Sequence, residues 1–420
     1  MKEKILIYQV LPRLWRNGRF SGWDAEAFDY LKSLSVTHVW YTGIPRHASG
    51  KPFVKGDPGS PYAVEDWHDV NPYLADVPSR RMSEFKALVD RTHKAGLKVI
   101  TDFIPNHVAR SYKGDIPHFD DCDYDWTDTL KVDYSAEGCW DRMLEVILFW
   151  AGKGVDGMRC DMVELIPPEF FKWATAEVRK RYHDFLFIGE VYRRDNYRRY
   201  VTELGFDLIY DKTGLYDTLR AIMAMPASTR GITWNWQDLQ DLQPGMLNFL
   251  ENHDEQRICS QAFLGGYERS VPGMAVAALF NGASLLIYSG QEQGEDAADS
   301  DDGRTSIFNW TGTIEIKGLD THRNRVLGVY RKLLKEASDP VFKAGANWDL
   351  AYCNEEAEGY DPDRHFVFMR YLGNDRRVVF CNFTDSEARV SVNIPEIDGK
   401  PACTVEMKTP GWNYSIKKLK

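Results

Sequence analysis

The chain has 420 residues, of which 43% are hydrophobic and 13% aromatic, and it carries a formal net charge of −10. These proportions exclude a disordered or fibrous protein, and the negative charge argues against a nucleic-acid partner, which would require a basic face. No apolar run approaches the roughly 18 residues of a membrane-spanning helix, so no membrane partner is expected. The length predicts one large domain and a smaller one.

The cysteines and the N-terminal segment indicate the cellular compartment. The seven cysteines form no C-x-x-C pair, so neither a disulfide framework nor a zinc ribbon is expected, and a reducing compartment fits. The opening "MKEKILIYQVLPRLW" lacks a small-residue cleavage site and is interpreted as a first strand. A cytoplasmic location is therefore expected, although a chain that had lost its signal peptide would look the same. The oligomeric state is not predicted.

Strand-like runs alternate with amphipathic helical stretches along the first 340 residues. Met82, Phe85, Leu88 and Val89 fall on one helical face, and Gly96 follows as a helix-ending residue. The predicted strands are 5–12, 37–45, 98–107, 157–164, 185–192, 207–212, 246–254 and 284–292. Eight strands alternating with helices predict an α/β fold in which a parallel sheet closes into a (β/α)₈ TIM barrel.

Two segments depart from this alternation. Residues 108–135, after the third strand, have no helical pattern and are interpreted as a short excursion from the barrel. Residues 345–420 contain alternating runs such as "FVFMRYL" and "ARVSVNI", which predict an antiparallel β domain. Residues 1–107 and 136–340 would then form the barrel. No low-complexity linker separates the two parts, so the β domain is expected to pack directly on the barrel.

Ionisable residues gather at the predicted strand ends, where barrel enzymes place catalysis. In "GMRCDMV", Arg159 and Asp161 are two residues apart and share a face, with Met158 and Cys160 on the other. A cation beside Asp161 would keep that carboxylate ionised, as a nucleophile requires. The strand-end set is Asp102, Asn106, His107, Arg159, Asp161, Glu190, His253 and Asp254.

Such a cluster suits either a metal site or paired carboxylates acting on a glycosidic bond. The metal interpretation lacks H-x-H and H-E-x-x-H spacings, and Arg159 would repel a divalent cation. A retaining glycosidase needs one ionised and one protonated carboxylate about 5 Å apart. Asp161 and Glu190 lie on adjacent strands, which are separated by about 4.8 Å, so the glycosidase interpretation is favoured.

Four segments resemble the conserved regions of the α-amylase family, glycoside hydrolase family 13. "DFIPNH" (102–107) resembles D-x-x-x-N-H and "GMRCD" (157–161) resembles G-x-R-x-D. "GE" (189–190) resembles the strand-five acid, and "ENHD" (251–254) the N-H-D of strand seven. The resemblance covers residues 1 to about 340. It also implies that 108–135 is a short domain B and that the C-terminal domain is an antiparallel β-sandwich.

The resemblance implies a role for each matching residue. Asp161 would be the nucleophile, Glu190 the general acid and base, and Asp254 the stabiliser of the transition state. Arg159 would orient Asp161.

Further residues would contact the sugar. His107 and His253 are expected to hydrogen-bond the sugar that is cleaved. Tyr62, in "SPYAVEDWHDVNP", resembles the family's stacking platform; ordinary core packing is the alternative for this ring.

No cofactor is expected to be required, but calcium is an open question. Asn106 and the acids of "DDCDYDWTD" (120–128) offer oxygen ligands that suit this ion. Family members that share the calcium site often carry Lys-His soon after the nucleophile, whereas Asp161 is followed by "MVELIPPEF".

The expected function is that of a retaining glycosidase. The enzyme would hydrolyse α-glucosidic bonds of malto-oligosaccharides or starch through a covalent glycosyl-enzyme. A transglycosylase or isomerase of the same family is the first alternative. A non-catalytic carbohydrate-binding barrel and a metal-dependent hydrolase are the others. Linkage preference and endo or exo action are not predicted.

Overall fold

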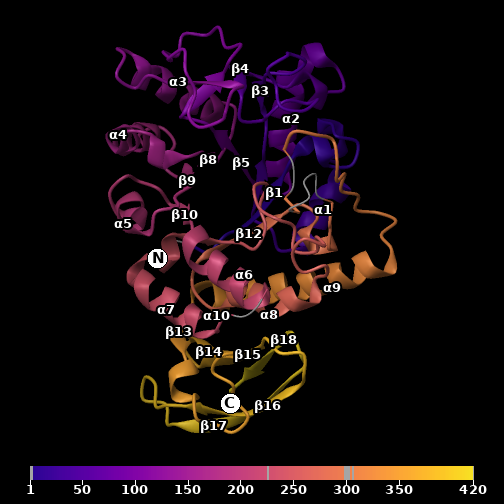
Figure 1. Ribbon diagram of the computed structural model, residues 1–420, viewed down its shortest axis with the longest axis vertical. Coiled ribbons are helices and arrows are strands. Elements are labelled where there is room, and N and C mark those ends of the chain that lie inside the picture. Colours follow the sequence, from indigo (N-terminus) through magenta and orange to yellow (C-terminus); the bar gives the residue numbers. More distant parts are fainter. Residues whose placement is uncertain (1–2, 225–226, 298–302, 305–306, 420) are drawn as a thin grey trace.

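The computed structural model describes residues 3–224, 227–297, 303–304 and 307–419, and within them a closed parallel barrel. The barrel order is β1-β12-β11-β10-β9-β8-β5-β2, which confirms the predicted TIM barrel (Figure 1). Its strands are β1 (Leu6–Val10), β2 (His38–Tyr41), β5 (Lys98–Phe103), β8 (Gly157–Cys160), β9 (Leu186–Gly189), β10 (Leu208–Tyr210), β11 (Met246–Asn248) and β12 (Ser284–Tyr288).

The barrel strands begin where the sequence predicts but end earlier. The seventh was expected to run to 254, yet β11 ends at Asn248, so Phe249 and Leu250 lie beyond it. Its neighbour β10 ends at Tyr210 and pairs with β11 only up to Leu247. On its other side β11 pairs with β12 up to Asn248, after which the chain leaves the sheet. The polar residues predicted at strand ends therefore lie mostly on the loops that follow.

Alternation along the strands separates two apolar regions. Ile7, Trp40, Ile100 and Leu247 belong to one buried cluster inside the barrel. Met158 and Cys160 belong instead to the larger core shared with the surrounding helices. Arg159, between them in sequence, lies on the opposite face, as predicted, beside Trp40 and Tyr210 of the interior cluster.

Helices cover the outside of the barrel (Figure 1). In α2, Phe85, Leu88 and Val89 are buried as predicted, and Gly96 takes a left-handed φ of +82° just after the helix. Among the described residues, no helix is long and apolar enough to span a membrane. The α-helices are α1 (Ala25–Ser33), α2 (Arg81–Lys94), α3 (Cys139–Gly152), α4 (Pro168–Arg179), α5 (Arg194–Thr202), α6 (Asp217–Ala224), α7 (Arg230–Leu239), α8 (Val271–Leu279), α9 (Thr321–Ala337) and α10 (Pro340–Ala344).

Two antiparallel hairpin sheets project from the barrel. The sequence did not predict the first, in which β3 (Pro45–His47) pairs with β4 (Val64–Val70) between β2 and α2. The second pairs β6 (His107–Ala109) with β7 (Thr129–Lys131) in the predicted excursion after β5. β3 and β4 lie at the end of the molecule opposite the C-terminal strands (Figure 1). The domain limits predicted from the sequence, 1–107 with 136–340, 108–135 and 345–420, remain predictions.

The C-terminal strands form a sandwich, as expected. β13 (Ala346–Asp349), β14 (His365–Leu372), β15 (Asp375–Asn382) and β18 (Asn413–Lys418) make one sheet, and β16 (Ala388–Ile394) pairs with β17 (Cys403–Thr409). A shared apolar core joins the two sheets.

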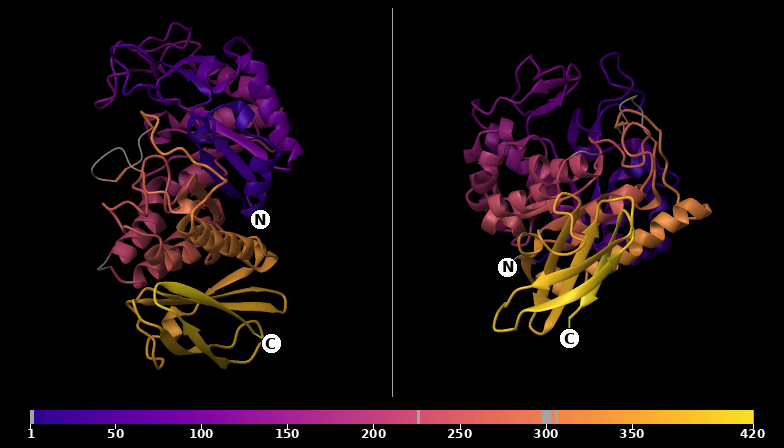
Figure 2. Two further views of the ribbon diagram at one scale, coloured as in Figure 1. Left: turned by 90° about the vertical axis from the view of Figure 1, so that its right-hand side faces the viewer. Right: turned by 60° about the horizontal axis from the view of Figure 1, so that its bottom comes forward.

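The sandwich packs directly on the barrel's helical layer, as predicted (Figure 2). The Phe280 ring, just after α8, lies 4.8 Å from that of Phe366 and 5.1 Å from that of Phe368. Arg370 donates to the carbonyl oxygen of Leu279 at 3.2 Å. The contact therefore combines an aromatic cluster with a buried hydrogen bond.

Candidate active site

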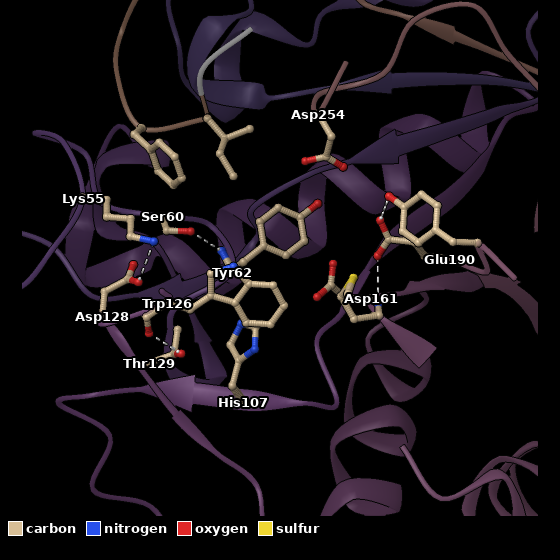
Figure 3. Close-up of a pocket in the computed structure, with 14 residues that line it drawn as sticks. Lys55, Ser60, Tyr62, His107, Trp126, Asp128, Thr129, Asp161, Glu190 and Asp254 are labelled. Carbon is tan, nitrogen blue, oxygen red and sulfur yellow. Dashed lines mark hydrogen bonds and ion pairs between the residues drawn. The ribbon is translucent and has the colours of Figure 1, made fainter. Parts of the chain in front are cut away.

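A pocket of about 320 Å³ opens at the carboxyl ends of the barrel strands, where the sequence placed the catalytic residues (Figure 3). It contains the carboxylates of Asp161, Glu190 and Asp254, which follow β8, β9 and β11, and a fourth, Asp128, together with aromatic and basic side chains. Its lining residues are Lys55, Ser60, Tyr62, His107, Trp126, Asp128, Thr129, Asp161, Met162, Glu190, Tyr192, Asp254, Ile307 and Phe308.

The buried guanidinium of Arg159 connects the three carboxylates. Its Nη1 contacts Asp161 Oδ1, and its Nη2 lies 2.9 Å from Glu190 Oε1 and 3.9 Å from Asp254 Oδ2. Arg159 itself is fully buried. A desolvated cation is stable only with nearby negative charge, so the guanidinium and the acids depend on one another.

Aromatic rings surround the same guanidinium. Its central carbon lies 5.5 Å from the ring centroids of Trp40 and Tyr210 and 5.6 Å from that of Tyr62. Arg159 Nε also donates to the Tyr210 hydroxyl at 3.3 Å. Cation–π contacts add to the electrostatic stabilisation and fix the plane of the guanidinium.

Asp161 follows β8 directly and is held on both sides. Its backbone N–H donates to the carbonyl oxygen of Phe103 at 2.9 Å, and its side chain pairs with Arg159. Burial raises the pKa of Asp161 above its ordinary value, while Arg159 opposes the rise. The net direction is opposite to the one expected from Arg159 alone, because removal of water outweighs the neighbouring cation.

Glu190 follows β9 and accepts two further hydrogen bonds. The Met162 N–H donates to Oε2 and the Tyr192 hydroxyl to Oε1, each at 2.8 Å. Burial raises the pKa of Glu190, Arg159 opposes the rise and Asp161 adds to it. A carboxyl group held more protonated than usual is suited to donate a proton.

Met162 reaches Glu190 through an unfavourable backbone conformation. Its φ of 42° and ψ of 45° are left-handed, which costs a non-glycine residue about 1–3 kcal/mol. Met162 also lines the pocket. The strained turn after Asp161 therefore turns a backbone N–H toward the second carboxylate.

Asp254 lies on a loop braced by a buried ion pair. Arg257 Nη1 donates to Glu251 Oε2 at 3.0 Å, and the Ile258 N–H donates to Glu251 Oε1 at 2.7 Å. The Asp254 N–H donates to Asn252 Oδ1 at 2.9 Å, so Asn252 braces the turn. Glu251 is 1% exposed and lies outside the pocket lining. Its role is to hold the loop that presents Asp254.

The Asp254 carboxylate faces its neighbours across the pocket. About 39% of its side chain is exposed, and His253 Nε2 lies 3.1 Å away. Partial removal from water, then the charges of Glu190 and Asp161, raise the pKa of Asp254 well above its ordinary value, while Arg159 lowers it. Three carboxylates around one guanidinium hold at least one proton more readily than three isolated acids.

Tyr62 lines the pocket and stacks on His253, which lies behind it. The two rings are 5.2 Å apart and inclined by 6°. The Tyr62 hydroxyl lies 2.5 Å from His253 Nε2 and donates to Asp102 Oδ1 at 3.3 Å, while Gln9 donates to His253 Nδ1 at 2.6 Å. Protein groups thus contact both ring nitrogens of His253, which is 1% exposed. A direct bond from His253 to a sugar requires Tyr62 or Asp254 to move.

His107 faces the pocket directly. Its ring lies 5.3 Å from that of Trp126, and both side chains line the cavity. Burial lowers the pKa of His107 to about 4. The imidazole is therefore neutral near pH 7 and can both donate and accept a hydrogen bond.

The structure thus brings all seven predicted substrate and catalytic residues to one place. Five line the pocket, and Arg159 and His253 lie directly behind them. The sequence interpretation gave no role to Lys55, Trp126, Met162 and Tyr192, and it considered Asp128 only as a calcium ligand. Tyr192 follows Glu190 by two residues, and this same-face spacing was its available signal.

The predicted calcium ligand Asn106 does not face a calcium-like donor set. Its Nδ2 donates to Asp123 Oδ2 at 3.0 Å, and Lys131 Nζ lies 2.9 Å from Asp123 Oδ1. An ammonium group thus occupies the position beside the carboxylate that a divalent ion would need. Nowhere in the described part of the chain do three or more His, Cys, Asp or Glu residues form a metal-holding group. These residues do not fit calcium.

Comparison with known proteins identifies the family of the chain. The family model described as "Alpha amylase, catalytic domain" matches residues 17–128 and 123–349. The chain belongs to the α-amylase family. The alpha-amylase MalA of Haloarcula japonica is 24% identical over 93% of this chain and 57% of its own length. The chain therefore spans little more than half of that relative.

Two further proteins in the family show its range. An alpha-1,4-glucan:maltose-1-phosphate maltosyltransferase of Cereibacter sphaeroides is 27% identical over 48% of this chain and 39% of its own length. The crystal structure of an alpha-amylase from Lactobacillus plantarum matches with a TM-score of 0.76, covering 99% of each chain at 21% identity. The last match supports the fold.

The Asn106, Asp123 and Lys131 contacts predict that calcium does not stabilise the protein. We expect the same melting temperature in excess calcium and in EDTA, because a ligand raises it only by binding the folded state. Differential scanning calorimetry measures this directly. A melting temperature that rises with calcium concentration would show that the folded protein binds the ion and would contradict this expectation.

Proposed function

We propose that this α-amylase-family chain is a retaining glycoside hydrolase that cleaves α-glucosidic bonds of malto-oligosaccharides or starch. The observation that carries the proposal is the contact of Asp161 and Glu190 with the two terminal nitrogens of one guanidinium. Carboxylates held this close suit the shorter separation of retaining enzymes, about 5 Å. The wider separation of inverting enzymes leaves room for a water molecule between acid and base.

The first step forms a glycosyl ester. An Asp161 oxygen attacks the anomeric carbon while Glu190 gives its proton to the glycosidic oxygen, whose bond to that carbon breaks. The leaving sugar departs with this proton, and Glu190 becomes a carboxylate. The Tyr192 hydroxyl and the Met162 N–H already point at the Glu190 oxygens that gain this charge.

The second step returns the enzyme to its starting state. Glu190 takes a proton from water, the water oxygen attacks the anomeric carbon, and the ester bond to Asp161 breaks. Two displacements at one carbon give net retention. Asp254, on the opposite wall of the pocket, stabilises positive charge on the sugar in both transition states.

Transfer to another sugar is the second candidate, because it uses the same glycosyl ester. The name of the Cereibacter sphaeroides relative, a maltosyltransferase, favours keeping this possibility. An isomerase would likewise return the sugar to its own leaving group. A carbohydrate-binding barrel without catalysis is disfavoured, because three acids assembled around one arginine have no use in binding alone.

The nucleophile assignment predicts that Asp161→Asn lowers turnover of maltotriose by about 10⁴-fold or more, since an amide cannot form the ester. The far-UV circular dichroism should not change. Chromatography of the wild-type products separates the two candidates: products shorter than maltotriose indicate hydrolysis, and longer products indicate transfer.

A matched control is Asp184→Asn, which makes the same chemical change at an exposed position outside the pocket. It should keep wild-type turnover. If Asp161→Asn were as active as this control, Asp161 would not be the nucleophile.

Tyr192→Phe tests the acid assignment through pH dependence. The Tyr192 hydrogen bond lowers the pKa of Glu190, so its removal raises that pKa further. A general acid works when protonated and loses activity as pH rises through its pKa. We therefore expect the basic limb of the kcat/KM profile to move to higher pH. A basic limb that stays in place or moves to lower pH would contradict the assignment.

A further inference from the structure

A basic and acidic pair stands at the end of the pocket remote from the catalytic acids. Lys55 and Asp128 lie on one side of Figure 3, Glu190 on the other, and Tyr62 and Asp161 between them. All five line the same cavity. Its volume of about 320 Å³ is at the small end of the range of about 300–1,000 Å³ for ligand pockets.

The order of these residues gives the pocket a direction, which rests on the proposed function. Glu190 protonates the leaving oxygen, so the leaving sugar lies on the Glu190 side. The sugar that becomes attached to Asp161 then lies on the Tyr62 side, toward Lys55 and Asp128. In a chain cleaved this way, that side holds the non-reducing end.

Lys55 and Asp128 can still form hydrogen bonds with a ligand, because they do not hydrogen-bond each other. Lys55 Nζ lies 3.6 Å from Asp128 Oδ1, beyond hydrogen-bond distance, and donates to the Asp125 carbonyl oxygen at 3.4 Å. The Asp128 side chain is 3% exposed and that of Lys55 is 32% exposed. An ammonium has three donors and a carboxylate several acceptor positions, so a hydroxyl placed here can both accept and donate.

The loop that carries Lys55 is fixed by contact with the loop that carries Phe308. Gly56 has a φ of +70°, and a Cβ at this position would lie 1.8 Å from the Phe308 carbonyl oxygen. The next residue, Asp57, accepts a hydrogen bond from Trp310 Nε1 at 2.8 Å. Only glycine permits this approach. Lys55 therefore belongs to a wall built from two loops.

We propose that Lys55 and Asp128 recognise the free non-reducing end of an α-glucan, so that the enzyme removes short units from chain ends. A terminal sugar carries a free 4-hydroxyl, which can donate to Asp128 and accept from Lys55. An internal sugar of an α-1,4 chain has no such group, because its O4 carries the next sugar. That next sugar would also need the space filled by the two side chains.

The test compares two maltoheptaosides with p-nitrophenyl at the reducing end, one with a free non-reducing end and one blocked there by a 4,6-ethylidene group. For the wild type we expect the blocked substrate to be cleaved at least about 100-fold more slowly, since a site that bonds a hydroxyl rejects an analogue lacking it. The free substrate should first release short sugars from its non-reducing end, identified by mass spectrometry.

Variants of Lys55 test whether the preference for the free over the blocked substrate depends on Lys55 and Asp128. Lys55→Ala, which shortens the wall, should bring the free-to-blocked ratio toward one. Lys55→Met keeps the length of the side chain without its donors, so it should slow the free substrate and keep the blocked one excluded. Lys51→Ala removes an exposed lysine of the same loop that lies outside this pocket and should leave the ratio unchanged. Because both rates are measured on the same enzyme sample, the ratio of free to blocked substrate cleavage does not change if part of the protein is unfolded.

Two results would overturn the proposal in different ways. Equal wild-type cleavage of both substrates would show endo action and reject chain-end recognition while supporting the hydrolase. Absence of cleavage of either substrate by folded wild type would reject the proposed function and, with it, this inference.

Discussion

The site depends on one buried cation. Arg159 is fully buried, and its guanidinium is balanced by Asp161, Glu190 and, at longer range, Asp254. These acids follow β8, β9 and β11, so the cation joins segments that are distant in sequence. Removing one partner of such a buried set leaves an uncompensated charge, which typically costs about 3–5 kcal/mol. The buried cation and the three acids therefore stabilise each other and hold these three segments together at this end of the barrel.

The acids also depend on backbone features that have no charge of their own. Met162 adopts a left-handed conformation and donates its N–H to Glu190. On the opposite wall the Glu251–Arg257 pair holds the loop of Asp254. The first feature costs backbone strain and the second costs removal of two charges from water. Each holds a carboxylate in place before substrate binds. Groups arranged in advance need no reorganisation during the reaction, which makes them effective at stabilising developing charge.

The sequence predicted what short-range patterns determine. Eight alternating runs gave the barrel, and the spacing of Arg159 and Asp161 placed both at one mouth of it. The sequence indicated the cation beside Asp161 but not that burial raises the pKa of this carboxyl group, because burial depends on groups far along the chain. The β3–β4 hairpin and Lys55 were missed for the same reason: each is positioned by contacts between loops, and no periodic pattern records such contacts.

Different contacts hold the three acids and the remote wall of the pocket in place. The acids are held by Arg159 and by loops of the barrel itself. The remote wall is held by contacts among the excursions, such as Gly56 against the Phe308 carbonyl group and Lys131 with Asp123. Neither set contains the other's members. Under the proposed chain-end recognition, changes in Lys55 or its loop would alter the length of substrate accepted without disturbing the charge balance around Arg159. On the proposed function, a barrel with the same three acids would serve different α-glucans, because the sugars would be selected by loops that Arg159 does not hold.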